Sequence, residues 1–347
     1  MTLALADPLA VAAPEPGRPR TIRVLGRVLP VSAVFDTYWR FAAERQAIYL
    51  RRLAGAPGPW TNDPVIRAHR FTNCYRATDR VSQYLIRRII YRGDQTPDEV
   101  VFRILLFKVF NKIETWEALE GAFGVVTWRS FDADRYADVL ARVVRENRTV
   151  YSAAYVMPNP PFGYLRKYRN HLALLEHMLR DGLVGKLQRS RSMDEAFRVL
   201  RGYPGLGDFL AFQYLIDINY SEVLDFSEMD FVVAGPGARS GLQKIFGPAA
   251  MGAEAYLIEH MVDHQERYVD DLGLSFEWLV GRPLQLIDCQ NLFCEVDKYA
   301  RVAHPEVSGG TSRHRIKQGY SKTSGKLDDP FFPPKWNARV RSLDTHV

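Results

Sequence analysis

The sequence predicts a mostly α-helical globular fold, and three observations favour it. Apolar residues recur at helical spacings of three, four and seven over most of the chain, whereas strand-like alternation is sparse. Hydrophobic residues make up 47% of the 347 residues and charged residues 25%, a composition typical of a globular core rather than of a disordered or repetitive chain. A chain of this length predicts one large domain or two closely packed ones.

The helices are predicted in order from this spacing and from the residues that begin and end each one. Residues 1–20 are rich in Ala and Pro and are expected to be disordered, while strand-like alternation is confined to residues 21–29 and 125–128. A first helix is expected at residues 35–53 and ends at the turn sequence APGPW. Further helices are expected at residues 78–91, 97–110, 132–146, 164–180, 193–200, 208–219, 252–272 and 284–303.

Two of these helices carry a predicted capping box at the N-terminus. Thr96 is followed by Pro97 and then by Glu99, and Ser192 is followed by Glu195. In each box the hydroxyl is expected to accept a hydrogen bond from the N–H of the Glu, while the Glu carboxylate reaches back to the cap. These boxes predict where both helices begin.

The charge and the cysteines limit the class of protein. The net charge is +6, and residues 301–347 carry nine basic and four acidic residues, so this stretch contributes +5 of it. We expect an irregular basic tail at residues 306–347, which suits a polyanionic partner, although a solvated tail without a partner explains it equally well. Three cysteines cannot form enough disulfides to stabilise a chain of this size, which indicates a reducing compartment. They are also too few to hold an iron–sulfur cluster. Without a leader sequence or a run of about 18 apolar residues, the sequence predicts a cytoplasmic protein with no membrane partner.

The first motif that suggests chemistry is YPGLGD at residues 203–208. Gly205 and Gly207 permit a tight hairpin between two helices, and its backbone N–H groups can bind a phosphate without any side-chain charge. This predicts contact with a DNA backbone. An ordinary connection between two helices, with Gly as the stop, is the alternative.

The second motif is the glycine-rich stretch DFVVAGPGARSG at residues 230–241. A loop that opens a short helix and carries Gly237, Arg239 and Lys244 can cradle phosphate groups, although a structural turn is the alternative. The pattern Gly-x4-Gly-Lys-Ser/Thr occurs nowhere in the sequence. This argues against a self-contained P-loop kinase.

The third motif, at residues 70–84, is dense in side chains that bind phosphates and bases. The candidates are Asn73, Arg76, Asp79, Arg80 and Gln83. At 100° per residue Asp79 and Gln83 lie on one stripe of a helix, with the two arginines beside it. A solvated face with local pairing among these residues is the alternative.

The fourth motif lies on the predicted helix at residues 284–303. On a helical wheel Asn291, Glu295 and Lys298 share a polar face with Asp288. In a cleft, Glu295 and Lys298 would form an acid–base or amine-orienting pair with perturbed pKa values, whereas on an exposed face they would be an ordinary ion pair.

No metal or cofactor is expected. His260 and His264 lie four residues apart, which is a spacing found in metal sites, but the surrounding sequence suits an ordinary amphipathic helix. No dinucleotide-binding fingerprint is present either, and the histidines form no nucleophilic triad with a Ser or a Cys.

Three stretches are far more specific together than any of them alone. They are RFTNCYRATDRVSQYLIRRII at residues 70–90, GDFLAFQYLIDINYSEVLDFSEMDFVVAGPGARSG at residues 207–241 and QNLFCEVDKYAR at residues 290–301. This combination resembles the alpha-glutamyl/putrescinyl thymine pyrophosphorylase family of DNA base hypermodification, whose domain is also described as the helical domain associated with 5-hydroxymethyluracil DNA kinases. The closing PPKW is similar to that family's ending, so the resemblance covers residues 30–336.

The resemblance implies a helix-hairpin-helix, DNA glycosylase-like fold at residues 21–305, made of two packed helical lobes, that acts on a flipped pyrimidine in DNA. It implies replacement of the pyrophosphate on a 5-pyrophosphoryloxymethyl-uracil base by an amine, such as an amino acid or a polyamine. Four cations would then bind the leaving pyrophosphate: Arg76, Arg80, Arg239 and Lys244. The implied partners are DNA, the amine and a separate DNA base kinase, and no cofactor is implied.

The resemblance also implies which carboxylates do chemistry. Similar glycosylases place a catalytic Asp soon after the hairpin, at a distance that fits Asp230 or, as the competing position, Asp225. Asp230 or Glu295 would take a proton from the attacking amine, with Lys298 and Asn291 completing the candidate catalytic set. A helix N-cap is the alternative for Asp230. Two other functions stay open: a glycosylase that removes a modified pyrimidine, and a non-catalytic DNA-binding module that accompanies a 5-hydroxymethyluracil DNA kinase.

Overall fold

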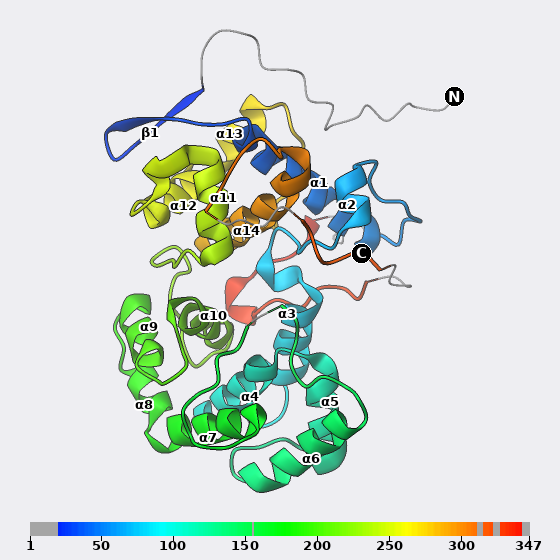
Figure 1. The fold of residues 1–347 in the computed structure, drawn as a ribbon, viewed down its shortest axis with the longest axis vertical. Coiled ribbons are helices and arrows are strands. Elements are labelled where there is room, and N and C mark those ends of the chain that lie inside the picture. Colours follow the sequence, from blue (N-terminus) through cyan, green and yellow to red (C-terminus); the bar gives the residue numbers. More distant parts are fainter. Residues whose placement is uncertain (1–19, 155, 311–314, 322–326, 342–347) are drawn as a thin grey trace. The chain divides into compact units, whose positions relative to one another are not determined.

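The computed structural model describes residues 20–154, 156–310, 315–321 and 327–341 (Figure 1). These residues are mostly helical with one small sheet, which confirms the predicted mostly α fold. The disorder expected at residues 1–20 falls, apart from Arg20, outside the described residues. The same holds for three parts of the expected basic tail, at residues 311–314, 322–326 and 342–347. Within the described ranges no helix is long and apolar enough to cross a membrane.

The chain divides into two compact units, each assembled from segments that are distant in the sequence. Unit 1 comprises residues 1–79, 232–330 and 338–347, and unit 2 comprises residues 80–231 and 331–337. The elements of unit 1 are β1 (Thr21–Val24), β2 (Arg27–Pro30), α1 (Val34–Leu53), α2 (Pro64–Ala68), the 3-10 helix η1 (Arg76–Thr78), α11 (Pro236–Phe246), the 3-10 helix η3 (Gly247–Ala250), α12 (Glu254–Asp263), α13 (Gln265–Asp271) and α14 (Leu286–Ala303). The elements of unit 2 are α3 (Arg80–Tyr84), the π-helix η2 (Leu85–Ile90), α4 (Pro97–Phe110), α5 (Ile113–Phe123), α6 (Ala133–Arg145), α7 (Lys167–Arg180), α8 (Leu183–Gln188), α9 (Met193–Arg201), α10 (Asp208–Asn219) and the 3-10 helix η4 (Pro334–Trp336).

Unit 1 is built around α14, against which α1 and α11 pack. Tyr38 of α1 and Phe293 of α14 are fully buried, and their ring centroids lie 4.8 Å apart. Burying such large aromatic side chains supplies much of the hydrophobic stabilisation of a small core. The strand-like residues 21–29 form an antiparallel hairpin, in which Thr21 pairs with Pro30.

The predicted glycine-rich loop at residues 230–241 is correct only as far as Gly235, because the rest of this stretch is helical. Helix α11 begins at Pro236 and its N-cap is Gly235. A Cβ atom at Gly241 would lie 2.2 Å from the carbonyl oxygen of Phe293, and one at Gly237 would lie 3.1 Å from Sγ of Cys294. The glycines therefore let α11 approach α14 closely. In the sequence alone, the same glycines indicate a loop, because glycine is common in loops.

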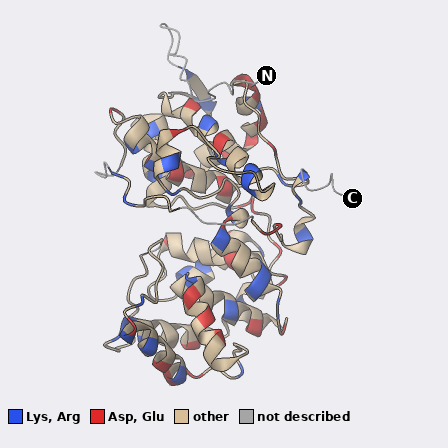
Figure 2. Cartoon of the chain, turned by 90° about the vertical axis from the view of Figure 1, so that its right-hand side faces the viewer, with Lys and Arg blue, Asp and Glu red and all other residues tan. Residues whose placement is uncertain are grey.

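Unit 2 has α4 in its core, because this helix is apolar on all sides and almost every residue is buried. One exception to its apolar character is Lys108, whose Nζ lies 2.8 Å from Oδ2 of Asp217 on α10. Both side chains are almost fully buried, so this ion pair fixes the register of α4 against α10 inside the core. Lys, Arg, Asp and Glu residues are interspersed along the helices of each unit (Figure 2).

The described part of the C-terminal segment contains one 3-10 helix, η4, and its residues 331–337 belong to unit 2. The ring of Trp336 contacts Tyr220 edge to face, at 5.1 Å between centroids. The side-chain amide of Gln83 pairs with the backbone of Phe331, donating at 3.2 Å and accepting at 2.8 Å. Gln83 thus anchors the returning segment.

Two predicted helices differ in their course. The helix expected at residues 78–91 begins only at Arg80 and becomes a π-helix from Leu85, so Asp79 precedes it and the predicted stripe of Asp79 and Gln83 is wrong. A π-helix has a wider turn than the 100° spacing assumes, and no simple sequence signal marks it. The helix expected at residues 252–272 is broken at His264, which ends α12 and precedes α13.

Two local predictions at helix ends and strands also need correction. Thr96 makes no side-chain cap to α4. The Glu99 carboxylate does not reach back to the cap but accepts hydrogen bonds from the N–H groups of Trp128 and Arg129. These contacts hold residues 125–128 in an irregular loop rather than in the expected strand. The Ser192 cap of α9 is present, since its hydroxyl accepts from the N–H of Glu195.

Candidate functional site

Two of the sequence motifs, residues 70–79 and the polar face of α14, meet in unit 1. The backbone N–H of Thr72 donates a 3.0 Å hydrogen bond to Oε2 of Glu295. The same oxygen lies 2.7 Å from Nζ of Lys298, which in turn lies 4.6 Å from the ring centroid of Phe71. The Glu295 and Lys298 side chains are only 13% and 15% exposed. They therefore form a sheltered ion pair rather than a solvated one.

Arg45 of α1 fixes the loop that carries Thr72. Its Nε donates a 3.0 Å hydrogen bond to the carbonyl oxygen of Thr72, and one terminal nitrogen donates to Oδ1 of Asn73 at 2.9 Å. Sequence reasoning missed this residue. Because Arg45 lies on the apolar stripe of α1, four residues after Phe41 and three before Ile48, a charge among buried positions was the signal that could have found it.

Asp79 lies at the end of η1 and completes the cluster. Its Oδ1 accepts a 2.9 Å hydrogen bond from the N–H of Asn73. Burial, together with the negative charge of Glu295, raises the pKa of Asp79 from its ordinary 3.8 to about 7, against the lowering effects of the Asn73 N–H and of Arg45 and Arg76. At neutral pH this carboxyl group can therefore both accept and donate a proton.

Two other candidates from the sequence, Arg76 and Asn291, differ in their hydrogen bonds. Arg76 is buried, and its backbone N–H donates a 2.7 Å hydrogen bond to Oδ1 of Asp288. Asp288 also closes the capping box of α14 with Gln285, and burial raises its pKa. Asn291 lies one turn before Glu295 and is half-buried, and its side chain makes no hydrogen bond to a described residue.

The two cations of the predicted phosphate-binding stretch on α11 both lie near carboxylates. Lys244 is buried, and its Nζ donates a 2.9 Å hydrogen bond to the carbonyl oxygen of Asp297 and lies 3.3 Å from the carboxylate of that residue. Its charge therefore balances a buried carboxylate between α11 and α14. Arg239 is exposed, with Nε 3.9 Å from Oε1 of Glu254, and Gly237 faces Cys294.

In unit 2 the predicted hairpin connects α9 to α10. Gly205 has a φ of +83°, and Gly207 is the N-cap of α10 with open space where a Cβ would lie. Within the described chain the N–H groups of Gly205, Gly207 and Asp208 donate no hydrogen bond. Unbonded N–H groups before a helix of this length can bind an anion.

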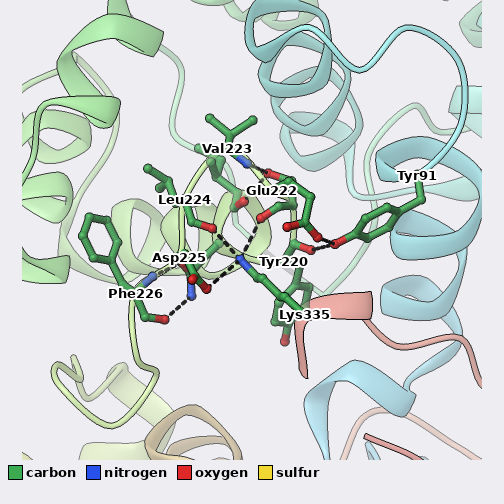
Figure 3. A network of polar contacts seen from close by, with 11 residues as sticks. Tyr91, Tyr220, Glu222, Val223, Leu224, Asp225, Phe226 and Lys335 are labelled. Carbon is green, nitrogen blue, oxygen red and sulfur yellow. Dashed lines mark hydrogen bonds and ion pairs between the residues drawn. The ribbon is translucent and has the colours of Figure 1, made fainter. Parts of the chain in front are cut away.

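The two aspartates that follow the hairpin are both exposed to solvent. Asp230 is exposed in a turn, where its N–H donates to the carbonyl oxygen of Ser227 at 3.2 Å. Since the N-cap of α11 is Gly235, the N-cap alternative for Asp230 is wrong. The Asp225 carboxylate is 88% exposed and lies 3.6 Å from Nζ of Lys335 (Figure 3).

Lys335 binds the backbone that follows α10. Its Nζ donates hydrogen bonds to the carbonyl oxygens of Ser221, at 2.8 Å, and of Leu224. Burial lowers the pKa of Lys335, although the nearby Asp225 raises it. The remaining candidate of unit 2, Arg80, is exposed with one guanidinium nitrogen 4.0 Å from Glu114.

The fold and the cluster define a class of protein: a helical domain whose sheltered acid–base group is assembled from a loop and the last long helix. Residues 32–309 match the family described as the 5-hmdU DNA kinase, helical domain. Because this match spans most of the chain, the chain belongs to that family.

A curated relative shares part of this sequence. The 5-hmdU DNA kinase of Bacillus phage SP10 is 24% identical over 288 residues, which cover 77% of this chain and 45% of the phage protein. The chain therefore spans about half the length of that relative. No solved structure matches the chain.

Proposed function

We propose that this chain is a DNA base-hypermodifying transferase, which replaces the pyrophosphate on a 5-pyrophosphoryloxymethyl-uracil base in DNA by an amine. Two observations support it. The family and the phage relative are named for 5-hmdU in DNA, the hydroxymethylated base from which such a pyrophosphate ester derives. The sequence carries no P-loop, so its own residues are better suited to a step after phosphorylation than to phosphorylation itself.

The observation that carries the chemical part of the proposal is the cluster of Asp79, Glu295 and Lys298. An amine nucleophile is protonated at neutral pH and must lose a proton before it attacks. A carboxylate with a pKa near the working pH is the most effective base for that transfer, and Asp79 has a pKa of about 7. Lys298, sheltered beside Glu295, supplies a positive charge for the departing pyrophosphate.

The proposed step balances as a substitution at the exocyclic methylene carbon. The amine nitrogen gives its electron pair to that carbon, and the carbon–oxygen bond breaks with its electrons on the pyrophosphate. Asp79 takes the proton from the amine. The products are an aminomethylated uracil in DNA and free pyrophosphate, and no oxidant or reductant is needed.

The proposal also expects the base to leave the helical stack, because enzymes that do chemistry on a DNA base commonly extrude it into an active-site pocket. The hairpin between α9 and α10 supports this part, since its free N–H groups suit a phosphate of the DNA backbone. On this basis we propose that α9, the hairpin and α10 act as a helix-hairpin-helix in a glycosylase-like fold. The amine and a separate DNA base kinase are the further proposed partners, in the cytoplasm.

Mass spectrometry of the nucleosides tests this function. Purified protein would be incubated with DNA that contains hydroxymethyluracil or its pyrophosphate ester, with and without a mixture of amino acids and polyamines. A new amine adduct that requires the pyrophosphate ester supports the transferase. Abasic sites would instead indicate a glycosylase that removes a modified pyrimidine, and DNA that is bound but unchanged would indicate a non-catalytic module.

A further inference from the structure

A loop between α6 and α7 of unit 2 holds large apolar side chains in solvent. Leu165 is 95% exposed, Val156 is 90% exposed and Tyr164 is 48% exposed, and Leu165 is the most exposed large hydrophobic side chain of the described residues. Single exposed apolar residues are common on protein surfaces and need no explanation. What distinguishes this loop is that buried side chains of α7 hydrogen-bond its backbone.

A buried asparagine fixes the backbone that presents Leu165. Oδ1 of Asn170 accepts a 2.9 Å hydrogen bond from the N–H of Tyr164, and its Nδ2 donates to the carbonyl oxygen of Tyr164 at 2.7 Å and to Oδ1 of Asn159 at 2.9 Å. Asn170 is only 1% exposed, so these bonds are needed to offset the cost of burying its amide. The exposed tip is therefore preorganised rather than loose.

The next residue of α7 anchors the other end of the loop. His171 is buried, with Nε2 2.8 Å from the carbonyl oxygen of Pro158 and Nδ1 2.7 Å from the hydroxyl of Tyr151. Burial lowers the pKa of His171 to about 4. The ring is thus neutral at physiological pH. Because a carbonyl oxygen can only accept, Nε2 carries the proton and Nδ1 accepts from Tyr151.

The loop also packs against the hairpin that carries the free N–H groups. The nearest atom to a Cβ at Gly205 would be Cβ of Pro160, at 3.5 Å. The ring of His177 bridges the two segments, with centroids 5.9 Å from Phe162 and 5.8 Å from Tyr203. An apolar tip and a set of unbonded backbone donors therefore belong to one packed surface of unit 2.

The charge beside this tip selects the kind of partner. Arg166 directly follows Leu165, is exposed and makes no ion pair with a described residue. An exposed apolar side chain that is next to such a cation, on a loop that packs against the unbonded N–H groups of the hairpin, has the chemistry of a wedge that enters the base stack of DNA. Three apolar side chains are too few for the buried core of a stable protein–protein interface.

We propose that Leu165 is an intercalating wedge, which enters the base stack of duplex DNA and occupies the space that an extruded base leaves. This rests on the proposed action on DNA and deepens it. The phosphate contacts of the hairpin would set the register, while Leu165 would make extrusion favourable by replacing the lost stacking.

A duplex with 2-aminopurine next to the target base tests the wedge, because the fluorescence of this base analogue rises when it is unstacked. The variants are Leu165→Ala and, as the matched control, Val125→Ala, which removes another exposed apolar side chain of unit 2. Wild type and Val125→Ala should bind the duplex and raise the fluorescence equally. Leu165→Ala should bind about ten-fold more weakly and lose the fluorescence rise, since it loses the burial of most of a leucine side chain.

Two results would overturn the wedge, and they can be told apart. If wild type binds no DNA, the proposed function fails together with the wedge. If wild type binds and unstacks the duplex but Leu165→Ala behaves identically, only the wedge fails. A Leu165→Ala variant that keeps normal DNA binding and fluorescence but no longer associates with a DNA base kinase would show that the tip docks on protein instead.

Discussion

At the scale of single residues, the strongest signature is the raised pKa of Asp79, which is caused mainly by burial and further by the negative charge of Glu295. Because the pKa of Asp79 in the folded protein lies above its ordinary 3.8, the folded state binds more protons than the unfolded state between about pH 4 and pH 7. The contribution of Asp79 to the free energy of unfolding should therefore fall as the pH rises through this window. Above about pH 7 the contribution is constant.

The Asp79→Asn variant should remove this pH dependence. Asn keeps the Oδ1 atom that accepts from Asn73 but carries no charge, so the variant should gain about 1–3 kcal/mol in unfolding free energy relative to wild type between about pH 5 and pH 8. Urea unfolding at a series of pH values measures this difference. In Glu295→Gln the inflection should move to lower pH but stay above 3.8, because burial still raises the pKa of Asp79 while the added effect of the Glu295 charge is gone. A difference between Asp79→Asn and wild type that does not change with pH would contradict the raised pKa of Asp79.

The residues of the cluster were only partly predictable. Asn73, Asp79, Glu295 and Lys298 stand out in the sequence because polar side chains are dense around them. Their meeting does not, since Thr72 and Glu295 are 223 positions apart and no local pattern encodes such a contact. Whether a polar side chain reaches solvent is decided by the tertiary fold, which is why Arg76 and Lys244 could be identified as cations but not as buried ones.

At the scale of elements, the glycines of α11 set how closely two helices pack. Gly241→Ala should destabilise unit 1 by about 3 kcal/mol or more, because its Cβ would collide with a backbone oxygen of α14 that cannot rotate away. Gly121→Ala is the control, since this position within α5 has open space around it, and the exchange should stabilise by about 0.5–1 kcal/mol. Thermal unfolding of both variants measures the difference. Equal stability of the two would show that α11 does not need glycine at position 241.

The hairpin between α9 and α10 allows a cleaner test of DNA binding. Gly207 has a φ of −73°, and no atom lies within 4 Å of the position that a Cβ would take there, so Gly207→Ala should leave the fold nearly intact while its Cβ obstructs a phosphate. We expect weaker DNA binding, measured by titration at several salt concentrations. Gly205→Ala is a poor probe, because the φ of +83° would strain alanine and alter stability as well. Unchanged affinity in Gly207→Ala would remove the hairpin from the interface.

Elements with strong helical spacing were predictable and elements defined by close packing were not. The bounds of α1, α6, α10 and α14 follow from apolar spacing and agree with the structure within a residue or two. The start of α11 was missed because Gly and Pro favour loops in the absence of a neighbour. The π-helix at Leu85–Ile90 was missed because its extra residue per turn depends on tertiary contacts rather than on composition.

At the scale of the whole molecule, residues 331–337 of the C-terminal segment are part of the structure of unit 2. Lys335→Met should destabilise it by about 1–3 kcal/mol, because the carbonyl oxygens of Ser221 and Leu224 lose a charged donor in a partly buried site (Figure 3). Lys317→Met, at an exposed position in the part of the C-terminal segment that belongs to unit 1, is the control and should change little. Differential scanning fluorimetry of both variants checks this. A stable Lys335→Met protein would mean that residues 331–337 are only loosely attached.

For the whole chain, we propose that the cluster of Asp79, Glu295 and Lys298 performs the chemistry on a DNA base. The most direct measurement is the amount of amine-modified nucleoside formed per enzyme, by mass spectrometry, for wild type, Asp79→Asn, Glu295→Gln and Asp230→Asn at equal DNA saturation. We expect Asp79→Asn to lower turnover by about two to four orders of magnitude and to abolish its rise with pH through about 7, with the fold and DNA binding retained. Glu295→Gln should also be impaired, whereas Asp230→Asn should be close to wild type. Full turnover in Asp79→Asn and Glu295→Gln, with loss only in Asp230→Asn, would contradict the claim and assign the chemistry to the carboxylate that follows the hairpin.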